Sequence, residues 1–166
     1  MKSLIAVSGS GGKKDMIPHH VLAIAEELGL YIAHQGAVLV TGGRGGVMEA
    51  ACKGAKKADG LTLGILPNEK DDANDFVDIA IGTGLSFQRN FLIAQVADCL
   101  ICLAGGWGTL SEISAACVLE KPVVFVETSF GMVDKFLKNN VISQGYQKYA
   151  VADNAKDAVE LACGFM

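Results

Sequence analysis

The chain has no long apolar run and no segment that resembles a leader. Apolar residues make up 51% of its 166 residues, which excludes intrinsic disorder. Charged or turn residues interrupt every apolar run before it reaches the length of a membrane span. The start, Met1–Leu4, enters a short predicted strand without the apolar region and cleavage site of a signal peptide. We therefore expect a single domain, residues 1–166, that is cytoplasmic and has no membrane partner.

A net positive charge and a metal-ligand pattern are also missing. A net charge of −4 and the lack of a basic stripe argue against a nucleic-acid partner. The five cysteines are scattered, and the only close pair, Cys99 and Cys102, should point to opposite faces of a strand. The histidines lie at the two ends of the first predicted helix: His19, His20 and His34. We expect buried free thiols, surface histidines and no metal site.

Glycine, by contrast, is abundant, and its most informative cluster follows a buried strand. The apolar run 99–104 is typical of a strand covered on both faces, and Gly105-Gly106-Trp107-Gly108-Thr109 comes next. A strand, a glycine turn and a helix start bring unpaired backbone N–H groups to one point, which favours an anion such as phosphate. Thr109 and Glu112 also fit a capping box, in which both side chains only satisfy helix N–H groups.

Two further glycine turns also follow predicted strands. Strand 4–8 is followed by Gly9-Ser10-Gly11-Gly12, and strand 37–40 by residues 41–46, Thr-Gly-Gly-Arg-Gly-Gly. The first turn is not a P-loop, because Val7 replaces the required glycine and Lys14 the Ser or Thr. A dinucleotide fingerprint needs an acidic residue after the second strand, which is missing, so NAD is not expected.

Strands and helices alternate along the whole chain. Further strands are predicted at 61–66, 76–81, 122–126 and 149–152, with helices over 18–36, 47–57, 85–97, 109 onwards, 130–138 and 155–163. The acidic stretch 67–75 is interpreted as a solvated connection. This order predicts an α/β fold, a Rossmann-like doubly wound sheet. It should be mostly parallel, with about six to seven strands and helices on both faces. Ligands bind such sheets at the carboxyl ends of the strands, where all three glycine turns should lie.

The helix predicted over 85–97 carries a charge in an apolar stripe. At helical spacing, Arg89 falls among Leu85, Leu92, Ile93 and Val96. A buried guanidinium needs an anionic partner, either a carboxylate such as Glu112 or a ligand, and the two interpretations are compatible. The opposite face carries Phe87, Phe91 and Ala94, which suggests that a second subunit covers this helix.

Together these residues resemble a known family. The runs Gly42–Glu49 (GGRGGVME) and Gly105–Glu112 (GGWGTLSE), with Arg89, are similar to the LOG ("lonely guy") superfamily. Its members are often mislabelled lysine decarboxylases, and it includes the molybdenum-cofactor carrier proteins. The resemblance extends from Leu4 to about Val126 and is closer to the small carrier-related bacterial and archaeal branch. No site resembling a pyridoxal-phosphate lysine supports the decarboxylase label.

The resemblance implies an activity and a set of site residues. LOG enzymes hydrolyse the N-glycosidic bond of nucleoside 5′-monophosphates, and Arg89 and Glu112 match their catalytic arginine and glutamate. Gly105, Gly106, Gly108 and Thr109 match their phosphate turn. Ala104 replaces the proline of the family motif, which should alter only the rigidity of the turn. Asn90 replaces the lysine that follows the family's arginine, which removes a positive charge near the site.

Two functions therefore stay open. One is hydrolysis of a purine nucleoside 5′-monophosphate, with Glu112 and Arg89 catalytic; the other is a non-catalytic carrier or sensor of a nucleotide or molybdopterin-type ligand. Both involve a small phosphorylated ligand, no required cofactor, no metal and a homodimer or homotetramer. A DNA-binding relative fits the negative charge poorly. The candidate ligand-binding residues are Ser8, Gly9, Ser10, Gly42, Gly43, Arg44, Gly45, Gly46, Asn90, Gly105, Gly106, Trp107, Gly108 and Thr109.

Overall fold

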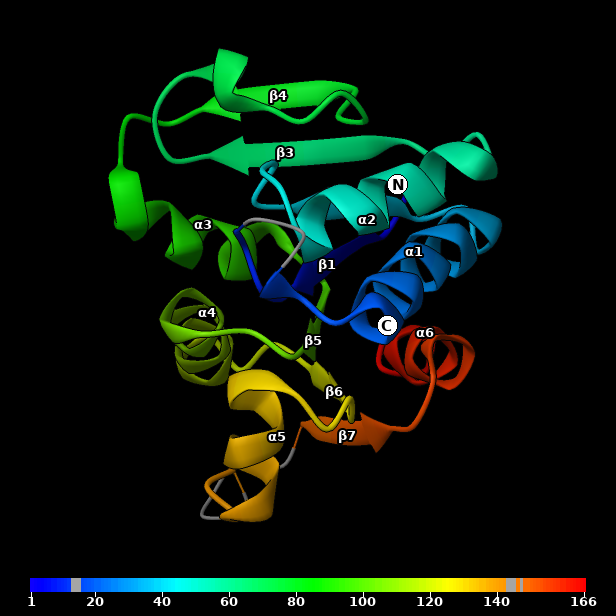
Figure 1. Ribbon diagram of the computed structural model, residues 1–166, viewed down its shortest axis with the longest axis vertical. Coiled ribbons are helices and arrows are strands. Elements are labelled where there is room, and N and C mark those ends of the chain that lie inside the picture. Colours follow the sequence, from blue (N-terminus) through cyan, green and yellow to red (C-terminus); the bar gives the residue numbers. More distant parts are fainter. Residues whose placement is uncertain (13–15, 143–145, 147) are drawn as a thin grey trace.

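The computed structural model contains one seven-stranded sheet in which all six neighbouring strand pairs are parallel (Figure 1). It describes residues 1–12, 16–142, 146 and 148–166, so Lys14, one of the two positions compared with a P-loop, lies outside the described residues. The strand order is β4-β3-β2-β1-β5-β6-β7. Successive strands are added on one side of β1 up to β4 and on its other side from β5 onward, so the topological switch point lies between β1 and β5. The strands are β1 (Leu4–Ser8), β2 (Val38–Thr41), β3 (Thr62–Leu66), β4 (Ile79–Gly82), β5 (Cys99–Leu103), β6 (Val123–Val126) and β7 (Tyr149–Ala152).

Helices cover both faces of this sheet. One apolar cluster joins it to α1 (His19–His34), α2 (Val47–Lys57) and α6 (Ala155–Gly164). The other joins it to α3 (Arg89–Val96), α4 (Trp107–Val118) and α5 (Gly131–Lys138), on the opposite side in Figure 1. The predicted doubly wound α/β architecture is therefore confirmed. Among the described residues, no helix is long and apolar enough to cross a membrane.

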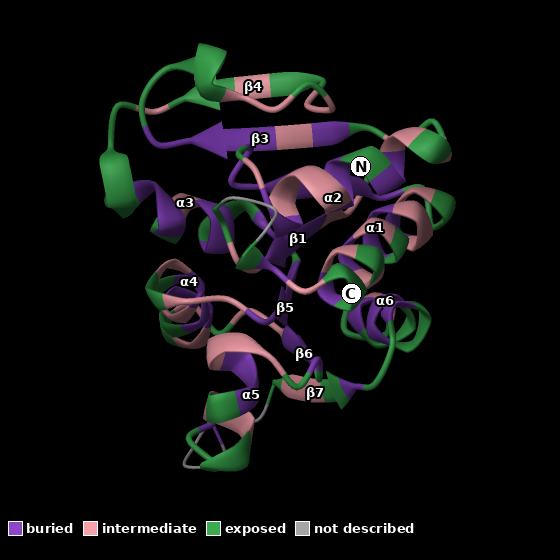
Figure 2. Ribbon diagram, in the orientation of Figure 1, coloured by how far each residue is buried: buried purple, intermediate pink, exposed green. Residues whose placement is uncertain are grey.

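The central strands are buried on both faces, as their unbroken apolar sequences predicted. Figure 2 shows β1, β5 and β6 as buried, whereas the edge strand β4 is largely exposed. Cys99 packs in the cluster under α1 and α6, and Cys102 in the cluster under α4. The two side chains therefore point to opposite faces, as expected, and both cysteines are free.

The segment around α3 differs from the sequence prediction. Strand β4 begins at Ile79 rather than residue 76, and a 3₁₀ turn, η3 (Ser86–Gln88), precedes α3. A 3₁₀ turn has about three residues per turn, so it shifts the phase of a helix drawn from residue 85. The predicted stripe is confirmed for Arg89 and Ile93, which are buried. It is wrong for Leu85, which precedes this turn, and for Val96, since both are exposed, and the predicted outer residue Ala94 is buried in the cluster with α4. The buried face of α3 consists of Arg89, Asn90, Ile93 and Ala94.

Candidate functional site

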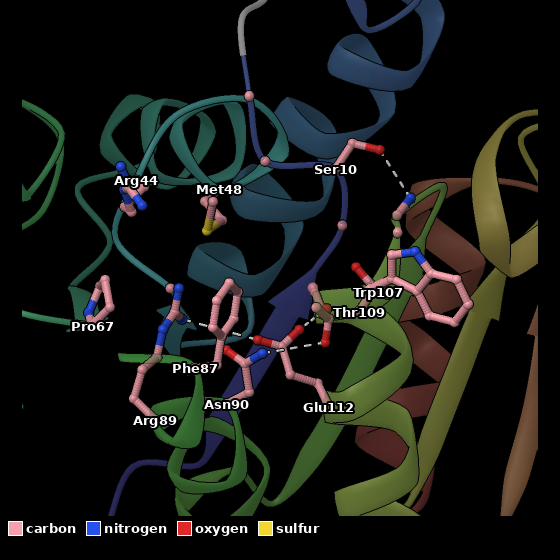
Figure 3. A pocket seen from close by; sticks show the side chains of 18 of the residues that line it. Ser10, Arg44, Met48, Pro67, Phe87, Arg89, Asn90, Trp107, Thr109 and Glu112 are labelled. Atoms are coloured by element: carbon pink, nitrogen blue, oxygen red, sulfur yellow. Dashed lines mark hydrogen bonds and ion pairs between the residues drawn. The ribbon is translucent and has the colours of Figure 1, made fainter. Parts of the chain in front are cut away.

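A pocket of about 840 Å³ lies at the carboxyl ends of the strands, where β1 and β5 meet. Figure 3 shows its side chains arriving from three sides: Arg44 and Met48 beside α2, Phe87 to Asn90 from the α3 segment, and Trp107 to Glu112 from α4. This edge is where an open α/β sheet binds ligands. The predicted residues that line the pocket are Ser8, Gly9, Ser10, Gly42, Arg44, Gly45, Arg89, Asn90, Gly105, Gly106, Trp107, Gly108, Thr109 and Glu112.

Two predicted ligand-binding glycines do not line this pocket. Gly43 faces the Leu66 side chain, and a β-carbon there would lie 3.1 Å from Leu66 Cγ. Gly46 precedes α2 and lies against the backbone carbonyl of Ser10, 2.4 Å from where its β-carbon would be. The sequence predicted that all of residues 42–46 bind the ligand, but only Gly42, Arg44 and Gly45 line the cavity.

Helix α4 begins three residues earlier than the capping box requires, because its N-cap is Gly106 instead of Thr109. Gly106 is its N-cap, Trp107 its first residue, and the first turn closes with the Leu110 N–H donating to the Gly106 carbonyl over 3.0 Å. Thr109 is therefore inside the helix, and its predicted role as the cap is wrong. The amides of residues 107–109 have no acceptor within the helix, and a helix terminus of this kind suits an anion. Gly105 adopts a φ of +77°, and any side chain there would collide with Thr109.

Glu112 points into the pocket floor instead of capping the helix. Its side chain is almost fully buried, with the residue 7% exposed. The Ser8 hydroxyl donates to Glu112 Oε2, and Arg89 Nη1 lies 4.0 Å from Oε1 (Figure 3). Burial raises the pKa of Glu112 to about 7, against the opposing effects of Ser8 and Arg89. The carboxylate is therefore able to exchange a proton near neutral pH.

Arg89 is the buried cation of the site. It is 9% exposed, and burial lowers the pKa of its guanidinium while Glu112 opposes that shift. Its Nη1 has no hydrogen-bond partner among the described residues. Buried donors are normally paired, so this atom is available to an acceptor in the pocket. Gly42 leaves the space that the guanidinium occupies, because a β-carbon there would lie 2.3 Å from Nη1.

Hydrogen bonds fix the three turns relative to one another. The Ser10 hydroxyl accepts from the Gly105 N–H over 3.0 Å, and the Ser10 carbonyl accepts from the Val47 N–H over 3.0 Å. From the α3 side, Asn90 Nδ2 donates to Ser111 Oγ over 2.8 Å. Asn90 is thus a buried, neutral residue that ties α3 to α4.

Ala104 affects more than turn rigidity. Its φ is +53°, whereas the proline ring fixes φ near −65°. Proline could therefore not occupy this backbone conformation, so the effect expected from the sequence is corrected here. The carbonyls of Ala104 and Gly105 accept from the Val133 and Met132 N–H groups at 2.8 and 3.0 Å. The start of α5 therefore supports the turn from behind.

Sequence reasoning missed part of the pocket wall. Pro67 and Asn68 follow β3, whose carboxyl end lies on the same edge, so their position in the chain could have indicated them. Phe87, which was predicted from the sequence to be part of a subunit contact, also lines the pocket. It is 82% exposed, and Trp107, another lining residue, is 81% exposed. The remaining residues that were not named for the site are Val7, Gly11, Gly12, Met48 and Ser86. Among the described residues, no group of three His, Cys, Asp or Glu is placed to hold a metal ion.

The sheet and its pocket define a Rossmann-like α/β protein with a ligand-sized cavity at the strand switch point. The SLOG cluster4 family matches residues 2–159, and the chain belongs to this family. The LOG and molybdenum-cofactor carrier resemblance noted in the sequence is thereby confirmed.

Known proteins of two kinds resemble the chain. A cytokinin riboside 5′-monophosphate phosphoribohydrolase of Mycobacterium tuberculosis is 31% identical over 86% of this chain and 85% of its own length. A molybdenum cofactor binding protein from the phototrophic bacterium Rippkaea orientalis is 38% identical, with a TM-score of 0.86 over 99% of this chain and 97% of its own. An uncharacterised protein of Archaeoglobus fulgidus is 52% identical, but the match spans 56% of this chain and 62% of that protein.

Proposed function

We propose that the chain binds a phosphorylated, nucleoside-like ligand in this pocket and hydrolyses the N-glycosidic bond of a nucleoside 5′-monophosphate. The observation that carries the proposal is the buried pair of Arg89 and Glu112, 4.0 Å apart beside the N-terminus of α4. A carboxylate with a pKa of about 7 next to an arginine with an unpaired donor suits glycosidic cleavage, in which one acid group acts at the anomeric carbon. The similarity to the phosphoribohydrolase supports the same reaction.

The parts of the pocket suit the parts of such a ligand. The phosphate would accept hydrogen bonds from the amides of residues 107–109, at the positive end of α4. The exposed rings of Phe87 and Trp107 offer apolar faces for a flat heterocycle. Arg44 adds a second positive charge at the α2 side of the cavity.

In the reaction, ionised Glu112 takes a proton from water as the water oxygen attacks the anomeric carbon. The bond from that carbon to the base nitrogen breaks, and the base leaves with a proton from solvent. Glu112 also stabilises the positive charge that develops on the ribose before attack. Arg89 favours the ionised carboxylate. The products are the free base and ribose 5-phosphate, and no metal or cofactor takes part in this scheme.

A carrier or sensor is the second candidate, and Asn90 favours it. The similarity to the molybdenum cofactor binding protein extends over nearly the whole chain. Asn90 places a neutral amide beside Arg89, where the LOG motif has a lysine, so the site has one positive charge fewer to offer a transition state. In this alternative the same pocket holds a nucleotide or molybdopterin-type ligand without turnover.

Incubation with AMP and related monophosphates tests the first proposal. Free base and ribose 5-phosphate should appear with the wild-type protein and disappear with Glu112→Gln. Glu160→Gln, which changes an exposed acid of α6 that pairs with Lys156, is the matched control and should retain release. Saturable AMP binding without release, unchanged by Glu112→Gln, would contradict the hydrolase and favour the carrier.

We also infer that the protein is a homodimer or homotetramer assembled through α3. Phe87 and Phe91 are exposed on this segment although both are large and apolar. Large exposed apolar side chains on one segment are typical of a subunit contact. Light scattering coupled to size exclusion should find an oligomer that Phe91→Asp dissociates. A wild-type monomer would exclude the contact.

A further inference from the structure

The Ser8 side chain contacts Glu112, the candidate catalytic acid. It is the last residue of β1, pairs in register with Cys102 of β5 and is 3% exposed. Its hydroxyl donates to Glu112 Oε2, across 104 positions of sequence. The sequence suggested Ser8 as a ligand-binding residue, but this hydrogen bond directs its hydroxyl to the carboxylate.

The two oxygens of Glu112 are contacted from different elements. Ser8 of β1 binds Oε2, and Arg89 of α3 faces Oε1 at 4.0 Å. A carboxylate held at one oxygen and attracted at the other has little freedom to rotate. The oxygen nearer to Arg89 makes the looser contact, so it is the one that a water molecule or ligand reaches more readily.

Within residues 1–12, 16–142, 146 and 148–166, few charges act on Glu112. Arg89 is the cation that faces it, and Arg44 acts on Arg89 from the α2 side. From β5, the buried Cys102 thiol faces the carboxylate, and burial raises the pKa of that thiol, so it stays neutral. Burial disfavours the negative charge of Glu112, and the hydrogen bond from Ser8 opposes this effect more than the charge of Arg89 does.

We propose that Ser8 is a positioning residue, whose hydroxyl holds one oxygen of the Glu112 carboxylate and so orients the other toward the pocket. This hydrogen bond also favours the ionised carboxylate. The consequence for catalysis rests on the proposed function of Glu112. The hydrogen bond itself does not, because the ionisation of Glu112 is measurable without turnover.

The test is an NMR titration of the full-length protein labelled with ¹³C at the glutamate carboxyl, with the Glu112 signal assigned by its loss in Glu112→Gln. Ser8→Ala should move the titration midpoint of Glu112 upward by about one pH unit or more, since a hydrogen bond to a charged group is lost. Ser8→Thr keeps a hydroxyl and should restore the wild-type midpoint. Ser10→Ala removes a hydroxyl that contacts Gly105 instead, so it should leave the midpoint unchanged.

An unchanged midpoint in folded Ser8→Ala would overturn the proposal. If that variant does not fold, Ser8→Cys, with a weaker donor, provides the same comparison and should also shift the midpoint upward. The pH profile of ribose 5-phosphate release separates this proposal from the proposed function. A shifted midpoint without any release would overturn the hydrolase only. If ribose 5-phosphate is released and the pH profile of release is the same in Ser8→Ala as in the wild type, the role of Ser8 alone would be overturned.

Discussion

The guanidinium of Arg89 fills the space that a side chain at Gly42 would need: a β-carbon on Gly42 would lie 2.3 Å from Arg89 Nη1 and 2.7 Å from Met48 Sδ. The glycine at the end of β2 therefore determines where the guanidinium from α3 lies. Neither residue contacts the other through a hydrogen bond, yet the position of the buried cation depends on the missing side chain.

Gly42→Ala should displace Arg89 and reduce ribose 5-phosphate release by roughly 10-fold to 100-fold, because a shift of about 1 Å in a reacting group has effects of this size. Steady-state release from AMP measures the effect. Gly164→Ala is the matched control, since a β-carbon there would meet nothing within 4 Å. Equal loss in both variants would show that Arg89 is not the cause.

Ionisation of Glu112 should make the fold less stable as pH rises. Its pKa is about 7 in the folded protein against 4.5 for an ordinary glutamate, so the folded state favours the protonated form. The stabilisation is fully present below pH 4.5 and is lost as the pH rises through 7. It amounts to about 3 kcal/mol. Urea unfolding at pH 5 and pH 8 should show this fall relative to Glu112→Gln, whereas a constant difference between the two proteins would contradict it.

Ala104→Pro, which restores the residue of the LOG motif, should destabilise this chain. The observed φ of +53° is closed to proline, so the cost should exceed the roughly 1–3 kcal/mol of a residue held in a sparsely populated conformation. Ala104→Gly relieves the same conformation but removes a buried methyl group, and it should stay within about 1 kcal/mol of the wild type. Thermal unfolding of both variants measures the difference. A stable Ala104→Pro protein would mean that the turn adopts another backbone path.

Trp107 provides an optical signal for the pocket, since it is the single tryptophan and lies at the cavity. AMP should change its emission. Trp107→Ala should weaken AMP binding by about 5-fold or more, because a stacked base contributes about 1–3 kcal/mol. Isothermal titration measures affinity in both proteins. Val118→Ala, an exposed apolar residue at the far end of α4, is the control and should bind normally.

The fold was largely predictable because its strands are apolar runs that glycine, proline and charge interrupt cleanly. The predicted ranges of β1, α2 and β7 agree with the observed bounds. The edge of the sheet that carries the site also followed from the sequence, since each glycine turn comes directly after a strand. Parallel strands then bring those turns together.

The finer geometry was not predictable, because it depends on backbone angles that composition does not determine. The 3₁₀ turn at Ser86 takes Leu85 out of the predicted helical phase, and packing against α4 buries Ala94, which periodicity placed on the outer face. Thr109 matched a capping motif, but the helix had already begun at Trp107. Gly43 and Gly46 belong to the right turn yet point away from the cavity. Periodicity identifies a face only when the helix start and its phase are known.

The contacts at the pocket floor join distant parts of the chain, since Ser8 and Glu112 are 104 positions apart and Ser10 and Gly105 are 95 apart. Between them the chain builds four further strands and three helices. The wall built from residues 7–12 and 42–48 needs only the pairing of β1 with β2, but the pocket floor with Glu112 needs the later strands as well. Closing so long a loop costs entropy, which is offset only when β1 pairs with β5 and the apolar clusters around them pack. Ligand binding during refolding would consequently report that this late, long-range pairing is complete.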